Sequence, residues 1–241
     1  MPAYCCIYFT EGTRAKTVAF YILSALFTIL YGCVLLPIVW FIPASCQNIA
    51  CVWWTRVILW MCKVIDGISY EIIGRDCLPK GQFIVASAHQ SPLETLILYA
   101  EFRDVVTVMK KELKTLPILG MGFMALKMVF VDRGKKIAAL RKMVRECEAR
   151  AKEGRTLVLF PQGTSQLRDM HLHRGVAAVY SRVFLPVVPI VLDTGNYWPG
   201  KIFTLSKKRG KAKIRILPAI APGLESEELM ARLLVALQLQ P

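Results

Sequence analysis

The stretch Phe83-Ile-Val-Ala-Ser-Ala-His-Gln-Ser-Pro-Leu-Glu-Thr95 decides the fold. Its apolar beginning predicts a short buried strand, and Pro92 with the residues after it predicts the first turn of a helix. A buried strand that runs through a polar turn into a helix is typical of α/β proteins, which place ligand-binding groups at such turns. The turn contains His89, and Glu94 follows five residues later.

The same alternation of strand and helix continues along the chain after residue 66. Short β-branched or apolar runs predict strands at 69–73, 83–87, 105–109, 128–131, 156–160, 187–192 and 213–217. Helical periodicity or apolar content predicts helices at 93–101, 117–126, 135–152, 174–183 and 226–239. Because several strands are apolar throughout, the predicted fold class is α/β, with a mainly parallel sheet flanked by helices on both faces.

Composition limits the possible partners. The 241 residues are 55% hydrophobic with a mean hydropathy of +0.44, more than an ordinary soluble domain needs, which indicates a membrane. The net charge of +14 favours anionic lipid headgroups, phosphorylated substrates or an acidic carrier protein. No nucleic-acid partner is expected, because no arginine-rich arm or DNA- or RNA-binding motif is present. The eight cysteines lack metal or disulfide spacing and are interpreted as buried thiols in a reducing or membrane setting.

The apolar surplus is concentrated before residue 66. Residues 17–45 contain no charged side chain, and a helix over 17–40 would be about 36 Å long, against roughly 30 Å of bilayer hydrocarbon. A second apolar run at 48–65 contains Arg56 and Lys63. Two arrangements remain open: a helical hairpin embedded in one leaflet, which we favour, or one spanning helix followed by an interfacial helix. The predicted division is a membrane-associated part at 1–65 and an α/β domain at 66–241.

His89 and Glu94 are the candidate catalytic pair. A base that takes a proton from an alcohol needs a pKa near neutrality, and histidine supplies it. A neighbouring carboxylate fixes the tautomer of the imidazole and stabilises the imidazolium as it forms. Residues five apart do not meet on a regular helix, so contact requires His89 in the turn and Glu94 in the first helical turn.

Three further blocks follow in order. In Val129-Phe-Val-Asp-Arg133-Gly, an arginine stands just past a buried strand and suits a phosphate. In Leu157-Val-Leu-Phe-Pro-Gln-Gly-Thr-Ser165, a strand breaks into a turn that can offer backbone N–H groups and a hydroxyl to an anion. In Val188-Pro-Ile-Val191, the proline near the start of a strand predicts the edge or terminus of a sheet. No metal site is predicted, because His171 and His173 lack an apparent further ligand.

Taken in this order, the blocks resemble the glycerolipid acyltransferases, specifically the bacterial 1-acyl-sn-glycerol-3-phosphate acyltransferases. That family is marked by His-x4-Asp, Phe-Ile-Asp-Arg, Phe-Pro-Glu-Gly-Thr-Arg-Ser and Val-Pro-Val/Ile. The matching segments here are His89-x4-Glu94, Phe130-Val-Asp-Arg133, Phe160-Pro-Gln-Gly-Thr-Ser165 and Val188-Pro-Ile190. The resemblance covers roughly residues 68–220, and the apolar N-terminus is similar to the membrane-embedded hairpin of the family.

The resemblance implies a glycerol-3-phosphate acyltransferase-like fold and transfer of an acyl group from acyl carrier protein or acyl-CoA to the sn-2 hydroxyl of lysophosphatidic acid, giving phosphatidic acid. His89 would be the general base and Glu94 its orienting carboxylate, with no cofactor and no acyl-enzyme. The residues implied in substrate binding are Arg133, Gln162, Gly163, Thr164, Lys110, Arg168 and Arg174. The implied location is the bacterial inner membrane, with the catalytic domain on its cytoplasmic face.

Two departures from the family pattern bear on the acceptor. Glu94 replaces the usual aspartate and keeps its charge, whereas Gln162 and Ser165 stand where the family usually has glutamate and arginine. Loss of a charge-assisted hydrogen bond would lower acceptor affinity by about one to two decades unless another cation substitutes. The alternatives are therefore an acyltransferase for another lysolipid, such as lyso-ornithine lipid, and a catalytically inactive, membrane-bound lipid-binding relative.

Overall fold

The computed structural model describes residues 3–102, 104–132, 134, 136–162, 174–200 and 202–238, with only the backbone described at 3–13, 136 and 238. The helices are α1 (Ala3–Leu35), α2 (Ala44–Met61), α3 (Pro92–Glu101), α4 (Leu119–Ala125), α5 (Lys136–Lys152), α6 (Gly175–Val183) and α7 (Ser226–Gln238). The strands are β1 (Ile68–Ile73), β2 (Ile84–Ser87), β3 (Val105–Lys110), β4 (Val129–Val131), β5 (Thr156–Leu159), β6 (Val187–Leu192) and β7 (Gly210–Ile216). Every predicted strand and helix after residue 66 is present, within a few residues at each end.

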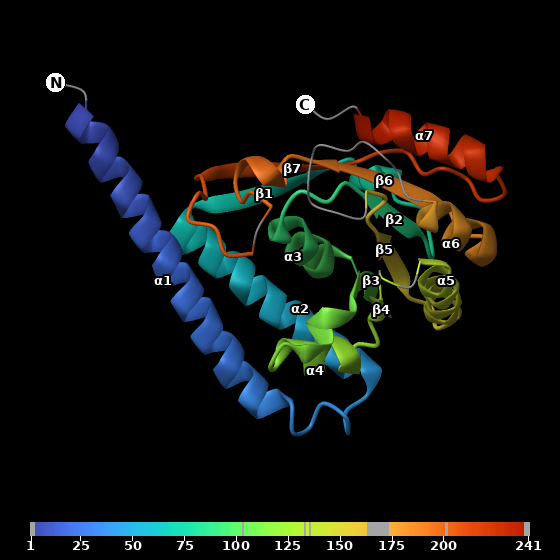
Figure 1. Ribbon diagram of the computed structural model, residues 1–241, viewed down its shortest axis with the longest axis horizontal. Helices are drawn as coiled ribbons and strands as arrows, with labels where there is room; N and C mark the ends of the chain where they lie inside the picture. The colour runs from blue at the N-terminus through green and yellow to red at the C-terminus, as the bar shows by residue number, and fades with distance from the viewer. Residues whose placement is uncertain are drawn as a thin grey trace.

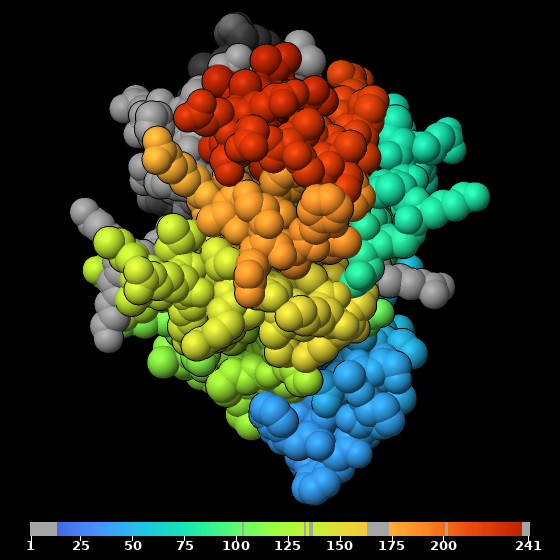
Figure 2. Space-filling model, turned by 90° about the vertical axis from the view of Figure 1, so that its right-hand side faces the viewer, coloured from blue at the N-terminus to red at the C-terminus, as the bar shows by residue number. Residues whose placement is uncertain are grey.

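The strands form one seven-stranded sheet in the order β1-β7-β6-β2-β5-β3-β4. Strands β6, β2, β5, β3 and β4 run parallel, β7 runs antiparallel to β6, and β1 runs parallel to β7. Figure 1 shows α2 and α3 on one face of the sheet and α5, α6 and α7 on the other, and Figure 2 shows the latter three side by side. The five parallel strands therefore end at one edge of the sheet, called here the carboxyl edge.

The core lies in the middle of this sheet, as the apolar strands predicted. All residues of β2, β5 and β6 are buried, whereas β7 alternates between buried and exposed residues. Strand β7 begins at Gly210, three residues before the predicted start. In its first half Lys211 and Lys213 are exposed while Ala212 between them is buried. Charged residues on its outer face thus hid the first half of this strand from sequence analysis.

Pro189 was expected to mark the edge or the terminus of a sheet, and the structure shows a terminus rather than an edge. Its strand, β6, lies inside the sheet between β7 and β2. The proline is tolerated because its carbonyl accepts a hydrogen bond from Leu217 N at 3.0 Å, one residue after β7 ends at Ile216. The nitrogen of Pro189 faces the same side, so its missing N–H falls at the terminus of the β6–β7 ladder rather than within it.

Two N-terminal helical segments are long and apolar enough to cross a membrane, Arg14–Leu35 and Ala44–Asp66. The first ends two residues before Pro37, and the second includes a π-helical turn, Cys62–Asp66. Large apolar side chains of α1 are exposed to the outside, among them Ile22, Leu26, Leu30 and Val34. Several large apolar side chains exposed along one helix indicate membrane association. Both the embedded hairpin and the span with an interfacial helix are compatible with these lengths.

The described cysteines do not all behave as the buried thiols expected. Cys62 and Cys147 are buried, whereas Cys33 and Cys46 are exposed and Cys77 is half-buried. Burial within the protein itself is thus found for Cys62 and Cys147 but not for Cys33 and Cys46. Their side chains lie on the outer surface of the two apolar helical segments.

The burial of Cys147, which lies in α5, leads to a testable prediction about its reactivity. Burial raises the pKa of its thiol from 9.0 to about 12. We expect Cys147 to stay unlabelled by a water-soluble maleimide at pH 8 in the folded protein, while Cys77 reacts, as followed by mass spectrometry. Because the folded pKa lies above the unfolded one, the stability contributed by the neutral thiol is lost as pH rises above about 9. Equal labelling of both cysteines would contradict the burial.

Candidate active site

The turn after β2 places His89 and Glu94 as the sequence predicted. Ser91 is the N-cap of α3, Pro92 opens the helix, and Glu94 is its third residue. The Ser91 hydroxyl accepts a hydrogen bond from Leu93 N at 3.0 Å, and Glu94 accepts one from Ser91 N at 2.9 Å, which together make a capping box. The capping box turns the Glu94 carboxylate back toward the turn. His89 lies in that turn, so the two side chains meet despite their spacing of five residues.

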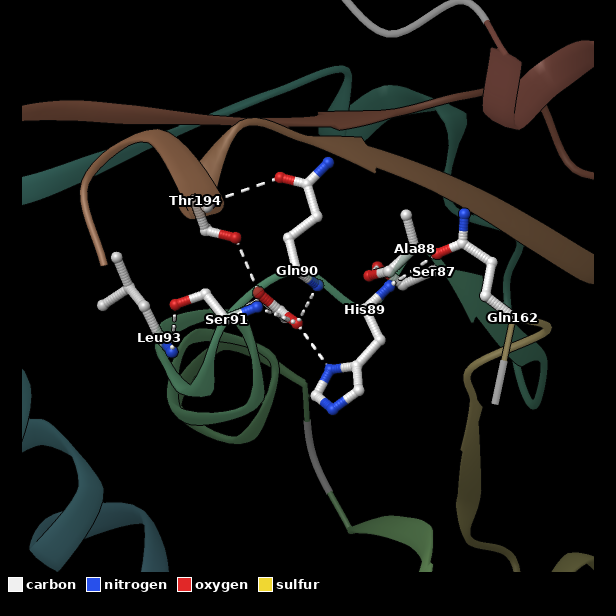
Figure 3. A network of polar contacts seen from close by, with 10 residues as sticks. Ser87, Ala88, His89, Gln90, Ser91, Leu93, Gln162 and Thr194 are labelled. Atoms are coloured by element: carbon white, nitrogen blue, oxygen red, sulfur yellow. Dashed lines mark hydrogen bonds and ion pairs between the residues drawn. The ribbon is translucent and has the colours of Figure 1, made fainter. Parts of the chain in front are cut away.

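Glu94 is completely buried, and both of its oxygens are hydrogen-bonded. Its Oε1 accepts from His89 Nδ1 at 2.7 Å and from the backbone N–H groups of Gln90 at 2.8 Å and Ser91 at 2.9 Å. Its Oε2 accepts from the Thr194 hydroxyl at 2.6 Å, and Figure 3 shows these contacts converging. Four donors satisfy the ionised form of a buried carboxylate.

His89 presents its other ring nitrogen away from Glu94. Because the carboxylate accepts from Nδ1, the neutral imidazole carries its proton there and its lone pair on Nε2. The side chain is 30% exposed. The centroid of its ring lies 4.5 Å from the ring centroid of Phe160, the residue after β5. This arrangement provides a proton acceptor that is held on one side, packed on another and open to a substrate.

Gln162 supports the histidine from the neighbouring strand connection. Its Oε1 accepts a hydrogen bond from His89 N at 3.2 Å, and its side chain is buried (Figure 3). Sequence analysis predicted Gln162 among the substrate-binding residues. In the structure its carbonyl oxygen is turned to the His89 backbone, which leaves its Nε2 as the group able to face a ligand.

The other predicted binding residues lie at the carboxyl edge or outside the described residues. Lys110 ends β3 and Arg174 precedes α6, both with exposed side chains. Neither contacts His89 or Glu94 among the interactions of the described residues. The predictions for Arg133, Gly163, Thr164 and Arg168, like the altered Ser165 and the histidine pair at 171 and 173, fall outside the described residues.

Asp132, the residue before Arg133 in the sequence, forms an ion pair with Lys111. Lys111 Nζ lies 2.7 Å from Asp132 Oδ2, and this contact raises the pKa of the lysine. Gly134 N donates to Asp132 Oδ1 at 3.1 Å. Asp132 is thus engaged with its neighbours at the end of β4. No group of three or more potential metal-ligating His, Cys, Asp or Glu side chains occurs in the described part of the chain.

Thr194 lies in a segment, 193–198, that fits the family pattern, but it was assigned no role; it is completely buried two residues after β6 ends. A signal was available, because a polar residue directly after a central parallel strand reaches the edge where ligands bind. Gly195 N also donates to Gln90 Oε1 at 3.2 Å, so this segment touches the His89 turn twice. The carboxyl ends of β2, β5 and β6 therefore all contribute to one site.

A second buried polar cluster was also missed. Lys207 Nζ lies 2.7 Å from Asp66 Oδ2, with both side chains about 1% exposed. The ammonium sits 3.5 Å from the ring centre of Phe20 and 3.6 Å from that of Trp198. Burial lowers the pKa of Lys207, while the ion pair with Asp66 acts in the opposite direction. This cluster ties α1 to the segment that follows Thr194, and we call it the lysine cage.

Proteins of known class are similar to this chain. A profile of the acyltransferase family matches residues 69–193, from β1 to the end of β6. A 1-acyl-sn-glycerol-3-phosphate acyltransferase from Pseudomonas aeruginosa is 30% identical over 217 residues, which are 88% of this chain and 81% of that protein. A Saccharomyces cerevisiae protein of the same name is 31% identical over 66% of this chain and 54% of its own length.

A solved structure shares the fold. The crystal structure of the 1-acyl-sn-glycerophosphate (LPA) acyltransferase PlsC from Thermotoga maritima matches with a TM-score of 0.74, covering 94% of both chains at 18% identity. The fold and the profile define an acyltransferase. The chain belongs to the 1-acyl-sn-glycerol-3-phosphate acyltransferase family and, by this homology, is an O-acyltransferase of phospholipid biosynthesis.

Proposed function

We propose that the protein transfers a fatty acyl group from a thioester to the sn-2 hydroxyl of 1-acyl-sn-glycerol-3-phosphate, giving phosphatidic acid. The observation that carries the proposal is the contact of 2.7 Å between His89 Nδ1 and a fully buried Glu94, with the histidine ring open on its other side. Family membership supports the acceptor, because the named relatives act on this lysolipid.

In the proposed reaction His89 Nε2 accepts the proton of the acceptor hydroxyl as its oxygen attacks the thioester carbonyl. Glu94 holds the imidazole and stabilises the imidazolium that forms. The tetrahedral intermediate collapses, the C–S bond breaks, and the leaving thiolate takes the proton back from His89. Each turnover thus forms one ester and one thiol, and needs neither a covalent acyl-enzyme nor a cofactor.

The acceptor phosphate would bind at the carboxyl edge. The proposed phosphate ligands follow parallel strands in the sequence or precede α6. They are four cationic side chains, the amide of Gln162 and the Gly163-Thr164 turn; the cations are Lys110, Arg133, Arg168 and Arg174. Exposed Lys110 and Arg174 support this position, since both stand at the same edge as His89. A guanidinium can meet two phosphate oxygens, and Arg133 would bind the phosphate together with the Gly163-Thr164 turn.

The proposal extends to the surroundings of the enzyme. Acyl carrier protein or coenzyme A would bring the acyl group, and the net charge of +14 suits either acidic donor. The helices before residue 66 would sit in the bacterial inner membrane, with the catalytic domain beyond that residue on the cytoplasmic face. Exposed apolar side chains along α1 support this division.

A second candidate keeps the chemistry and changes the acceptor. Gln162 stands where the family usually has glutamate, and its carbonyl oxygen accepts from the His89 backbone. Ser165 stands where the family usually has arginine, which removes a phosphate ligand, so an acceptor such as lyso-ornithine lipid is the alternative.

A substrate panel tests the proposal. Membranes containing the protein are assayed with lysophosphatidic acid, lysophosphatidylcholine and lyso-ornithine lipid, each with acyl carrier protein and coenzyme A donors. We expect lysophosphatidic acid to give at least about ten times the kcat/KM of the other acceptors, the discrimination expected when a charge-assisted contact is lost. Preference for lyso-ornithine lipid would move the assignment to the second candidate, and no transfer to any acceptor would indicate the inactive relative.

A further inference from the structure

Thr194 differs from the other donors to Glu94 in where it comes from. The three donors to Oε1 all belong to residues 89–91, beside Glu94 in sequence. Oε2 accepts from a hydroxyl one hundred residues further along the chain. Within the described part of the chain Thr194 is the only donor to that oxygen, and both side chains are completely shielded from solvent.

A glutamate carboxylate turns easily about its last side-chain bond, since that torsion has no sharp minima. Three donors hold Oε1, and the Thr194 hydroxyl adds a fixed point at Oε2, so together they set the plane of the carboxylate. We infer that Thr194 is a positioning residue for the catalytic pair: its hydroxyl holds Oε2 so that Oε1 stays aligned with His89 Nδ1. This inference rests on the proposed function of His89 as the base, and it adds a residue that acts through Glu94.

The backbone around Thr194 is built to keep the hydroxyl in place. Asp193 Oδ1 accepts from Lys213 N at 2.7 Å, which ties the end of β6 to β7. On the other side, Gly195 N donates to Gln90 Oε1. A Cβ at Gly195 would lie 3.1 Å from the Gln90 side chain, so glycine allows the close approach of the two segments. The threonine is thus clamped between its neighbours.

The same segment continues to α1. Trp198 is buried, and its ring stands edge-on to that of Phe20 at 5.6 Å. Tyr21 exchanges hydrogen bonds of 3.0 Å with Thr204 through its hydroxyl. An apolar helix of the N-terminal part therefore supports the segment that delivers the hydroxyl to Glu94.

The test compares Thr194→Val, which keeps the shape and removes the hydroxyl, with Thr194→Ser, which restores it. We expect Thr194→Val to lower kcat about ten-fold, the effect of one charge-assisted hydrogen bond, while the KM values of both substrates change less than about two-fold. Thr194→Ser should recover most of the loss. Thr107→Val, at a buried threonine on β3 away from the site, is the matched control and should keep the wild-type kcat.

A double-mutant cycle separates positioning from a general structural role. If Thr194 acts through Glu94, adding Thr194→Val to Glu94→Gln should cost less than about two-fold more, because the aligned carboxylate is already gone. A wild-type kcat in Thr194→Val, failure of serine to restore it, or a full repeated loss in the double variant would each overturn the inference. An active His89→Ala variant would instead overturn the proposed function, so the two failures can be told apart.

Discussion

Replacing His89 with alanine is expected to lower kcat for acyl transfer by about 10³-fold, the range that a general base contributes. The measurement is transfer of a labelled acyl group to lysophosphatidic acid at several pH values. Because the His89 side chain is partly exposed and makes one side-chain hydrogen bond among the residues that the structure describes, the variant should still fold.

Glu94→Gln is the second variant in this experiment and is expected to have a smaller effect on kcat than His89→Ala. The amide keeps the size of the side chain and loses the charge that holds the Nδ1 proton, so kcat should fall by an intermediate factor of about 10². Thermal unfolding in the same detergent controls for loss of fold. Full activity in the folded His89→Ala variant would refute the mechanism, and a Glu94→Gln loss larger than that of His89→Ala would assign the base to the carboxylate.

Replacing Lys207 with methionine is expected to have the largest effect on stability. The change leaves Asp66 buried without its cation, and breaking one partner of a buried pair costs about 3–5 kcal/mol. For a chain of this size that corresponds to a fall in Tm of roughly 10 °C. Thr17 Oγ1 still donates to Asp66 Oδ1 at 3.0 Å, but a hydroxyl does not replace a charge. Thermal unfolding in detergent measures the effect.

Two further variants make the result specific. Lys211→Met breaks an ion pair with Glu71 whose side chains are 58% and 32% exposed, so it should lower Tm far less than Lys207→Met does. The double variant Lys207→Met with Asp66→Asn should be more stable than Lys207→Met alone, because no uncompensated charge stays buried. Equal effects of Lys207→Met and Lys211→Met would show that the lysine cage does not stabilise the fold.

The lysine cage joins the two predicted parts of the chain by a contact that the sequence could not predict. The loss of apolar character near residue 66 is a local feature of the sequence. The pairing of Asp66 with Lys207 joins residues 141 positions apart, and neither neighbourhood has a pattern that points to the other. Burial of a lysine is unfavourable by itself, so composition alone predicts it on the surface.

The strands show the same contrast. Continuous apolar runs identified β2, β5 and β6 correctly, because a strand buried on both faces has no polar positions. The proline in β6 left both an edge and a terminus open, so the sequence did not place this strand inside the sheet. Only the pairing with β7 reveals that its missing N–H falls where that neighbour has ended.

The sequence by itself determined the class of fold, the strand-turn-helix around His89 and the contact with Glu94, because each depends on residues less than about ten positions apart and on short-range rules of capping and periodicity. Tertiary structure decided what completes the site. Thr194 and Gln162 reach the pair from β6 and β5 because parallel strands distant in sequence end at the same edge. The order of strands in a sheet depends on packing of the whole chain, and no local pattern contains it.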